Sequence, residues 1–218
     1  MDLSFLPSSL HKHFGNLLLP SVVFPLPTTF EEILDMPVMT TIEGIDGECS
    51  TSEDDQPPPP AVELPRIDWL EQMVARAHRH YDDFFIKVCG TSLKDAAWAA
   101  PLGLCASSYD EVLLLLQASE LVATAVERTK RLGLPLEIEF RQWCTVQRAF
   151  EFRCLVCDNH LVVICQRYLN DLCPQLAHAE ERAALQARIA EFFVTQFFPR
   201  NFPERDCHLL HRLTRRRC

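Results

Sequence analysis

The sequence predicts an α+β fold. Segments with helical spacing alternate with short strand-like runs, in the order helix, strand, helix, strand, hairpin, helix. Hydrophobic residues make up 48% of the 218 residues and charged residues 23%, which is the usual balance of a globular protein with a substantial core. No internal repeat is visible. These observations favour one large domain or two small lobes.

The elements of the first half are predicted from prolines and apolar spacing. Residues 21–27 are expected to be extended, because each proline biases its predecessor away from helix. Residues 28–34 resemble a short helix start. A longer helix is expected to begin near Asp68, followed by a strand at 84–88. The apolar residues at helical spacing in that helix are Leu70, Met73, Val74, Ala77 and Tyr81.

The second half begins with a capping box, Ser108-x-x-Glu111, which predicts a helix over the apolar run that follows it. Residues 136–144 alternate as a strand. Residues 151–157 and 160–167 are expected to pair as a hairpin, because Asp158-Asn159 between them is a tight-turn signal. A last helix is expected from about Ala179 and is ended by Pro199.

Four regions follow from composition. They are residues 1–43 as the N-terminal segment of a first lobe, 44–65 as an acidic, proline-rich loop, 66–206 as the main body, and 207–218 as a basic tail. The loop is expected to be disordered and the tail solvated. Residues 43–63 carry seven acidic side chains and no Lys or Arg, so they supply −7 of the net charge of −9. An acidic chain argues against general nucleic-acid binding.

Glycine and cysteine usage narrows the function classes. The 6 Gly are dispersed, which excludes a glycine-rich dinucleotide loop and a Walker-type phosphate loop. Proline interrupts the longest apolar run, 17–26, so no membrane span is expected. The 10 Cys are expected to be free thiols in the cytosol or nucleus, since no signal-peptide core follows Met1. Cys154 and Cys157 would point to opposite faces of a strand, which favours buried thiols over a zinc site.

The predicted hairpin carries the first candidate site. A regular hairpin places Glu151 opposite Gln166 and Arg153 opposite Ile164, so the acid, the base and the amide share one face. The guanidinium fork of Arg153 suits a phosphate, and a nearby carboxylate could orient it. The alternative is an ordinary cross-strand pair on a solvent-exposed face.

Two other strands carry the remaining candidates. Lys87 lies among aromatic residues, where an ammonium needs a partner or an anion such as phosphate; alternatively it is an edge-strand lysine that blocks aggregation. Arg141 and Trp143 share a strand face with Glu137 and Glu139, and could stack on a nucleobase. The alternative there is an ordinary amphipathic strand with a Trp covering the core.

Four motifs resemble those of the cell division cycle protein 123 family, over roughly residues 21–205. Their order and spacing are more specific than any one of them alone. They are the hydrophobic-Pro run 21–27, Phe85-x-Lys87 followed by Lys94-Asp95-Ala96-Ala97-Trp98, Arg141-Gln142-Trp143-Cys144, and Glu151-Phe152-Arg153-Cys154 with Asn159 and Gln166-Arg167.

The resemblance implies an ATP-grasp-like, two-lobed fold that is incomplete at the C-terminus. ATP would lie between the lobes, held by a strand lysine and a backbone hinge. The resemblance also implies an ATP-binding assembly chaperone for translation initiation factor 2, which binds its gamma subunit and is linked to cell-cycle progression. Such a protein is expected to be a cytoplasmic monomer without enzymatic turnover, and to contact neither membrane nor nucleic acid directly.

The family's nucleotide-binding residues carry over by position. Lys87 would contact the phosphates, and the stretch Gly90 to Asp95, with Ser92, would form the flexible loop near them. The adenine hinge would be Arg141, Gln142, Trp143 and Cys144. Arg153 and Gln166 would line the nucleotide site.

The sequence departs from the family in three places. The family usually reads Asn-Trp-Ser-x-Pro after the lysine strand, where this chain has Cys89-Gly90-Thr91-Ser92-Leu93. Tyr168 replaces the acid after Gln-Arg. The resemblance ends near Asp206, and no Asp-x-Asn follows to supply the family's magnesium ligands. A truncated or misspliced product is therefore expected, with magnesium expected for the family but its ligands absent here.

Two alternatives remain open at this point. One is an ATP-grasp ligase or nucleotidyl-transfer enzyme, which would need metal sites and an acceptor pocket. The other is a truncated interaction module that no longer binds ATP.

Overall fold

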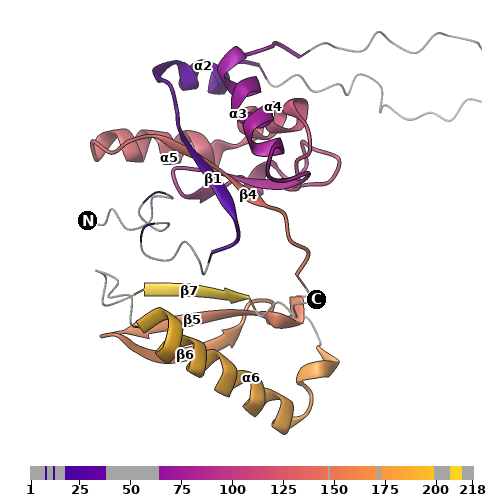
Figure 1. Ribbon diagram of the computed structural model, residues 1–218, viewed down its shortest axis with the longest axis vertical. Helices are drawn as coiled ribbons and strands as arrows, with labels where there is room; N and C mark the ends of the chain where they lie inside the picture. Colours follow the sequence, from indigo (N-terminus) through magenta and orange to yellow (C-terminus); the bar gives the residue numbers. More distant parts are fainter. Residues whose placement is uncertain are drawn as a thin grey trace, which may run out of the picture. The chain divides into compact units, whose positions relative to one another are not determined.

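A computed structural model describes residues 18–37, 64–146, 148–170 and 173–198, the backbone of 207–212, and the single residues Ser8 and Lys12. The chain divides into two compact units, one of residues 21–143 and one of residues 1–20 with 144–218. Each unit combines a β-sheet with helices (Figure 1), so the predicted α+β class is confirmed. Residues 44–63 of the predicted acidic loop lie outside the described residues.

The unit of residues 21–143 is built on a four-stranded antiparallel sheet with strand order β1-β4-β2-β3. Its strands are β1 (Ser21–Pro25), β4 (Glu137–Gln142), β2 (Phe84–Val88) and β3 (Thr91–Ser92). The predicted strands at 84–88 and 136–144 are thereby confirmed, and the segment predicted to be extended at 21–27 contains strand β1. β2 and β3 are joined by Cys89 (φ 48°) and Gly90 (φ 77°). Two successive positive φ values match the twist of a tight two-residue hairpin turn.

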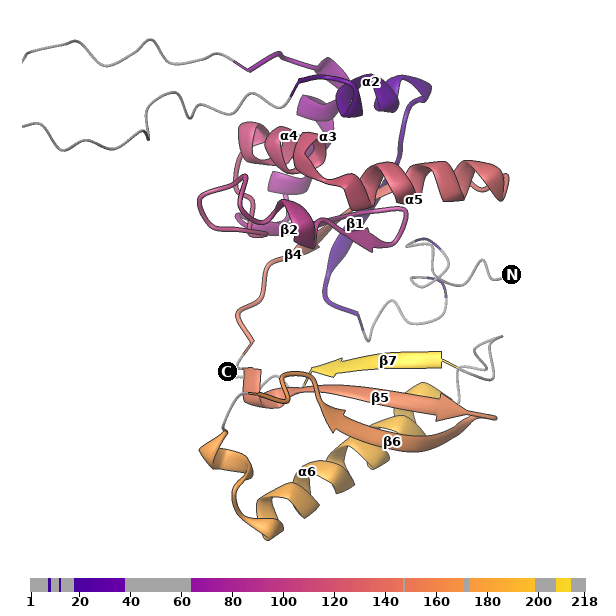
Figure 2. The ribbon, with the colours of Figure 1, turned by 180° about the vertical axis from the view of Figure 1, so that it is seen from behind.

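Helices pack on one face of this sheet and on one another. They are α2 (Glu31–Leu34), α3 (Asp68–His78), α4 (Tyr109–Ala118) and α5 (Glu120–Arg131), with short 3-10 turns η2 (Thr28–Phe30) and η3 (Lys94–Ala96). Figure 2 shows α5 lying across the strands. The core side chains that the sheet contributes alternate with its polar ones, and are Phe24, Phe84, Ile86, Val88, Ile138 and Phe140.

Side-chain caps start the two helices of the second half of this unit. The Ser108 hydroxyl accepts a hydrogen bond from the Glu111 N–H at 3.3 Å, as predicted, while Glu111 Oε2 accepts from the N–H of Ser107 at 2.7 Å. The Ser119 hydroxyl similarly accepts from the Val122 N–H at 3.3 Å. Helix α5, whose start depends on this second serine, was not predicted from the sequence.

The other unit carries a three-stranded antiparallel sheet with strand order β6-β5-β7. The strands are β5 (Glu151–Cys157), β6 (His160–Gln166) and β7 (Cys207–Arg212). Asp158 (φ 47°) and Asn159 (φ 63°) form the β5–β6 turn, which confirms the predicted tight hairpin. The 3-10 turns η4 (Arg148–Phe150) and η5 (Pro174–Leu176) flank the hairpin.

One helix packs on this sheet. It is α6 (Ala179–Phe192), which confirms the predicted start and continues as a π-helical segment, η6 (Phe193–Phe197). Two adjoining apolar clusters form the core between helix and sheet: Phe152 and Cys154 with Ile189, and Val156 with Phe193 and Phe197. The helix therefore covers the face of β5 that carries its even-numbered residues.

Residues 207–212 form strand β7 rather than the solvated tail expected from their composition. β7 pairs antiparallel with β5, from Glu151 opposite Arg212 to Val156 opposite Cys207. The physical reason is that β5 has a second edge of N–H and C=O groups, and a partner strand satisfies them. Residues 213–218 lie outside the described residues.

Candidate functional site

The polar face of the four-stranded sheet gathers several of the predicted site residues. Residues directly opposite one another in an antiparallel sheet share a face. Lys87 on β2 lies between Glu139 on β4 and Ser92 on β3, and Arg141 on β4 lies opposite Ser21 on β1. The structure thus brings Lys87, Ser92 and Arg141 to one face, together with Glu139, for which no role in binding was predicted.

Lys87 does not lie on an edge strand. β2 is hydrogen-bonded to β4 on one side and to β3 on the other, and Lys87 has a partner residue in both. The alternative interpretation, in which an edge lysine blocks aggregation, is therefore wrong. Lys87 is partly buried, in line with the expectation that its ammonium needs an opposite charge.

Glu139 is the centre of a hydrogen-bond network on this face. Its Oε1 accepts from the Ser21 hydroxyl at 2.7 Å, and from Nε and Nη2 of Arg141 at 3.1 and 2.7 Å. The side chains of Glu139 and Arg141 are 1% and 15% exposed. A largely desolvated, forked ion pair of this kind fixes the guanidinium plane as well as its position.

The charges around Glu139 keep it ionised. Burial by itself would raise the pKa of this carboxyl. The charge of Arg141, the hydrogen bonds from Ser21 and Arg141, and the charge of Lys87 more than offset that effect and hold the pKa below its ordinary value of 4.5. Glu139 is thus a carboxylate at neutral pH, buried among cations.

The stretch from Gly90 to Asp95 forms a hairpin turn, strand β3 and the turn η3. Asp95 is engaged at the start of α5, where its Oδ1 accepts from the Ser119 hydroxyl at 2.8 Å and its Oδ2 from the Leu121 N–H at 3.0 Å. Burial acts to raise the pKa of Asp95, but these hydrogen bonds hold it below 3.8. A carboxylate at a helix N-terminus is a stabilising arrangement, so Asp95 has a structural role here.

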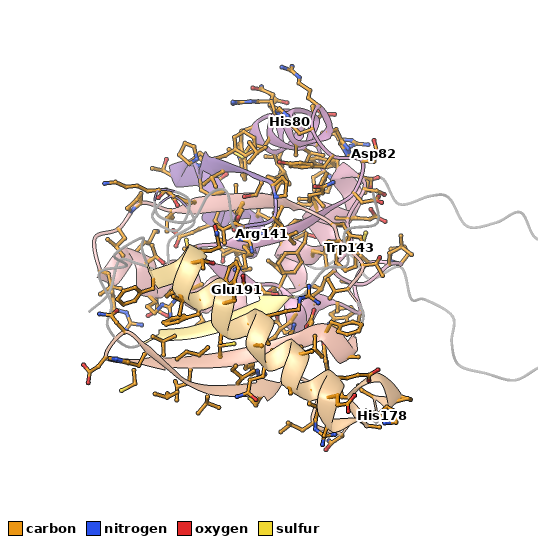
Figure 3. The ribbon with its side chains drawn as sticks, turned by 60° about the horizontal axis from the view of Figure 1, so that its bottom comes forward. His80, Asp82, Arg141, Trp143, His178 and Glu191 are labelled. Carbon is orange, nitrogen blue, oxygen red and sulfur yellow. The ribbon has the colours of Figure 1, made fainter. Side chains whose placement is uncertain are left out.

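The predicted adenine hinge lies at the end of β4. Arg141 is on the polar face, Gln142 points to the other face, and the Trp143 N–H donates to the Asp83 carbonyl at 3.0 Å. The Trp143 side chain is 38% exposed, and Figure 3 labels it beside Arg141. Cys144 is the first residue of the other unit in this part of the chain. Because the Trp143 N–H already donates to a carbonyl of the protein, other backbone groups of the hinge would have to form the hydrogen bonds to a nucleobase.

The β5–β6 hairpin differs from the predicted register. Leu155 is opposite Val163 and Val156 is opposite Leu161, so a β-bulge leaves Val162 without a facing partner. Beyond the bulge, Arg153 faces Cys165 rather than Ile164. A shift of one residue moves every β6 side chain to the opposite face relative to β5.

Arg153 and Gln166 therefore do not share a face, and the prediction that they do is wrong. Gln166 faces buried Phe152 on the side covered by α6, and its Nε2 donates to Cys173 Sγ at 2.8 Å. Arg153 lies on the other side and is exposed. Of the two, only Arg153 presents its side chain on the face that α6 leaves open.

The acid of this hairpin holds a different arginine from the one expected. Glu151 is buried, and its Oε2 accepts from Nη1 of Arg167 at 2.6 Å. The backbone N–H of Arg167 also donates to the Glu151 carbonyl at 2.8 Å. The motif pair Glu151 and Gln166-Arg167 was visible in the sequence, but only the folded register shows that the ion pair joins Glu151 to Arg167.

The prediction of buried thiols is confirmed for Cys154 and wrong for Cys157. Cys154 is buried and Cys157 exposed, on opposite faces of β5. Burial, with a smaller contribution from Cys165, raises the pKa of the Cys154 thiol to about 11. Within the described part of the chain, no group of three or more His, Cys, Asp or Glu residues could hold a metal ion. Nor does any described helix have the length and apolar character needed to cross a membrane.

Comparison with known proteins identifies the family. Residues 11–210 match the model of the family described as D123. The chain belongs to the D123 family. The match continues into β7, past the point near Asp206 where the sequence resemblance was expected to end. The predicted resemblance to the cell division cycle protein 123 family is confirmed.

Two names occur among the relatives of this chain. "Cell division cycle protein 123" of Phaeosphaeria nodorum is 30% identical over 57% of this chain and 35% of its own length. "Translation initiation factor eIF2 assembly protein" of Xenopus tropicalis is 24% identical over 91% of this chain and 65% of its own length. The chain thus spans between about a third and two thirds of these two relatives.

A solved structure supports the fold. C-terminally truncated Cdc123 from Schizosaccharomyces pombe superposes with a TM-score of 0.73 at 20% identity, covering 96% of this chain and 78% of that one. The site residues predicted from the resemblance are divided between the two units of the chain: Lys87, Ser92 and Arg141 lie in one, and Arg153 and Gln166 in the other. A nucleotide site formed by both units stays a prediction.

Proposed function

We propose that the chain is an ATP-binding assembly chaperone for translation initiation factor 2. Membership of the D123 family over residues 11–210 carries the proposal, because relatives in that family are named eIF2 assembly proteins. The chaperone acts by binding the gamma subunit and promoting its assembly with the other subunits. It does not turn over a substrate, and it works in the cytoplasm as a monomer.

The ATP part of the proposal is supported by the polar face of the four-stranded sheet. Lys87 and Arg141 place two cations there, with the Ser92 hydroxyl opposite Lys87. An ammonium on a central strand and a nearby hydroxyl suit the phosphates, in the absence of any glycine-rich loop. Magnesium would accompany ATP as in the family, held chiefly by the phosphates themselves.

The first experiment is calorimetric titration of the full chain with ATP, with and without Mg²⁺. Lys87→Ala is expected to weaken ATP binding by roughly tenfold or more, which is about the loss of one charge-assisted contact. Lys130→Ala is the matched control, because Lys130 is an exposed lysine on α5 and is not among the residues assigned to the nucleotide site. ATP binding that is absent from the wild-type chain, or equal in both variants, would refute the proposed ATP site.

The second experiment tests the partner with purified components. The chain is expected to capture the isolated gamma subunit of the initiation factor and to raise the yield of the assembled complex when ATP is present. Capture without any ATP binding would instead support an interaction module. AMP transferred to an acceptor would support a ligase or nucleotidyl-transfer enzyme.

A further inference from the structure

Both connections between the two units leave the four-stranded sheet from the same end. Ser21 is the first residue of β1 and of its unit, and the chain enters the other unit again after Trp143, just beyond β4. Ser21 and Arg141 are directly opposite each other in the β1–β4 register. The two crossings of the chain are therefore held side by side by one pair of antiparallel strands.

Glu139 links the side chains of these two strands. One oxygen, Oε1, accepts from Ser21 on β1 and from two nitrogens of Arg141 on β4. Lys87 faces the same carboxylate from β2, and its positive charge helps to keep the carboxyl ionised. Three strands thus converge on a carboxylate that is 1% exposed.

We propose that Glu139 is a positioning residue, which holds the Arg141 guanidinium and the Lys87 ammonium in place on the polar face so that they can bind the phosphates of a nucleotide. This inference rests on the proposed ATP site and assigns that site a residue the family motifs do not include. Glu139 does not touch the ligand. It acts by fixing two long side chains whose ordering would otherwise cost binding free energy.

Two effects of the Glu139 carboxylate, its negative charge and its positioning of the cations, predict opposite changes in ATP affinity when it is removed. A carboxylate beside two cations weakens their attraction for a polyphosphate, so its removal should strengthen binding if charge alone mattered. If Glu139 positions the cations, its removal weakens binding although the face becomes more positive. Glu137 provides the control, because it is a second buried acid on the same strand and face, and neither of the two Arg141 hydrogen bonds ends on it.

The experiment is calorimetric titration of the full chain with ATP for three variants. Glu139→Ala is expected to bind about tenfold more weakly than wild type, the size of one lost charge-assisted hydrogen bond. Glu139→Gln is expected to recover most of that loss, because its carbonyl oxygen can still accept from Ser21 and Arg141. Glu137→Ala is expected to bind at least as tightly as wild type. The inference is overturned if Glu139→Ala binds ATP as tightly as wild type or more tightly.

A second measurement separates this inference from the proposed function. The Nε–H signal of Arg141 in NMR is expected to be resolved and slow to exchange in wild type and Glu139→Gln, and lost in Glu139→Ala. If neither the wild type nor any variant binds ATP, the proposed function fails. The Arg141 Nε–H signal then decides by itself whether Glu139 orders Arg141. An unchanged signal in Glu139→Ala overturns the inference in either case.

A further variant covers the case in which Glu139→Ala does not fold. Arg141→Lys keeps the positive charge but cannot place two nitrogens on Oε1. It is expected to weaken ATP binding to the extent predicted for Glu139→Ala, with thermal unfolding recorded beside each titration to confirm that the variant is folded. Wild-type affinity in a folded Arg141→Lys would contradict the positioning role.

Discussion

For Glu139, the sequence pattern predicts the face of the strand but not the neighbouring side chains. Alternation along β4 placed Glu137, Glu139 and Arg141 on one face, and the structure confirms it. What alternation could not give is the order of the neighbouring strands, and hence that Lys87 and Ser21 meet the same carboxylate from opposite sides. The face on which Glu139 lies could therefore be predicted from the sequence. Its central place in the candidate site depends on the strand order, which only the structure shows.

The ionisation of Glu139 predicts a pH dependence of stability. Its pKa in the folded state lies below the ordinary value of 4.5, so the unfolded chain takes up the proton first as the pH falls. The stabilisation is fully present above about pH 4.5 and is lost as the pH drops through the folded-state pKa. Glu139→Gln lacks this contribution, and is expected to be less stable than wild type at pH 7 by about 2 kcal/mol.

Urea unfolding at pH 7 and near pH 3 tests this. The difference in unfolding free energy between wild type and Glu139→Gln is expected to shrink at the lower pH. Asp95 also has a lowered pKa, but it titrates in both proteins and so cancels from the difference. A difference that stays constant with pH would show that Glu139 has no lowered pKa in the folded protein.

At the scale of elements, the local sequence of the β5–β6 hairpin determines its turn and its two strands but not their register. The Asp158-Asn159 dipeptide and the two apolar runs were sufficient to predict the turn and both strands. The predicted register was wrong from Leu155 back toward the start of β5. The bulge that leaves Val162 without a facing partner is not marked by a turn residue or a glycine in the sequence. Packing of Phe152 and Cys154 against α6 depends on tertiary structure, which a local pattern does not contain.

The bulged register predicts different effects on ATP binding for substitutions of Arg153 and Gln166, which lie on opposite faces of the hairpin. Arg153→Ala is expected to weaken ATP binding by a few kcal/mol at most, since Arg153 is exposed on the face that α6 leaves open. Gln166→Ala is expected to change ATP affinity less than Arg153→Ala does, because the Gln166 amide is bound to Cys173. It should instead destabilise the protein by about 1 kcal/mol.

Calorimetry with ATP and urea unfolding of the two variants measure both effects. Equal losses of ATP affinity, without loss of stability in Gln166→Ala, would favour the regular hairpin register over the bulged one. Arg153→Ala with wild-type affinity would remove Arg153 from the nucleotide site.

For the whole molecule, the two units depend on different parts of the sequence. The unit of residues 21–143 is continuous, and its core elements were largely predicted from local spacing, with α5 as the exception. The other unit joins β5 and β6 to β7 across some forty residues of chain, and composition alone made residues 207–212 look like a solvated tail. Long-range pairing of this kind is set by an available strand edge, which no local motif reports.

Removal of β7 is therefore expected to affect one unit only. A chain that ends at Asp206 leaves the N–H and C=O groups on one edge of β5 unpaired. Amide hydrogen exchange in β5 should become faster by tenfold or more, on the order of the loss of a hydrogen-bonded edge, while exchange in β2 and β4 stays as in wild type. The exposed edge should also promote aggregation, because it can pair with another chain.

A chain that ends at Arg212 is the matched control, since it removes residues 213–218 and keeps β7. Its exchange rates are expected to equal those of wild type in both sheets. If β5 exchanges equally slowly in the chain that ends at Asp206, the β5–β7 ladder does not contribute to stability. If β2 and β4 also lose protection, the two units unfold together, and the two crossings that meet at Ser21 and Arg141 couple their stability rather than merely connecting them.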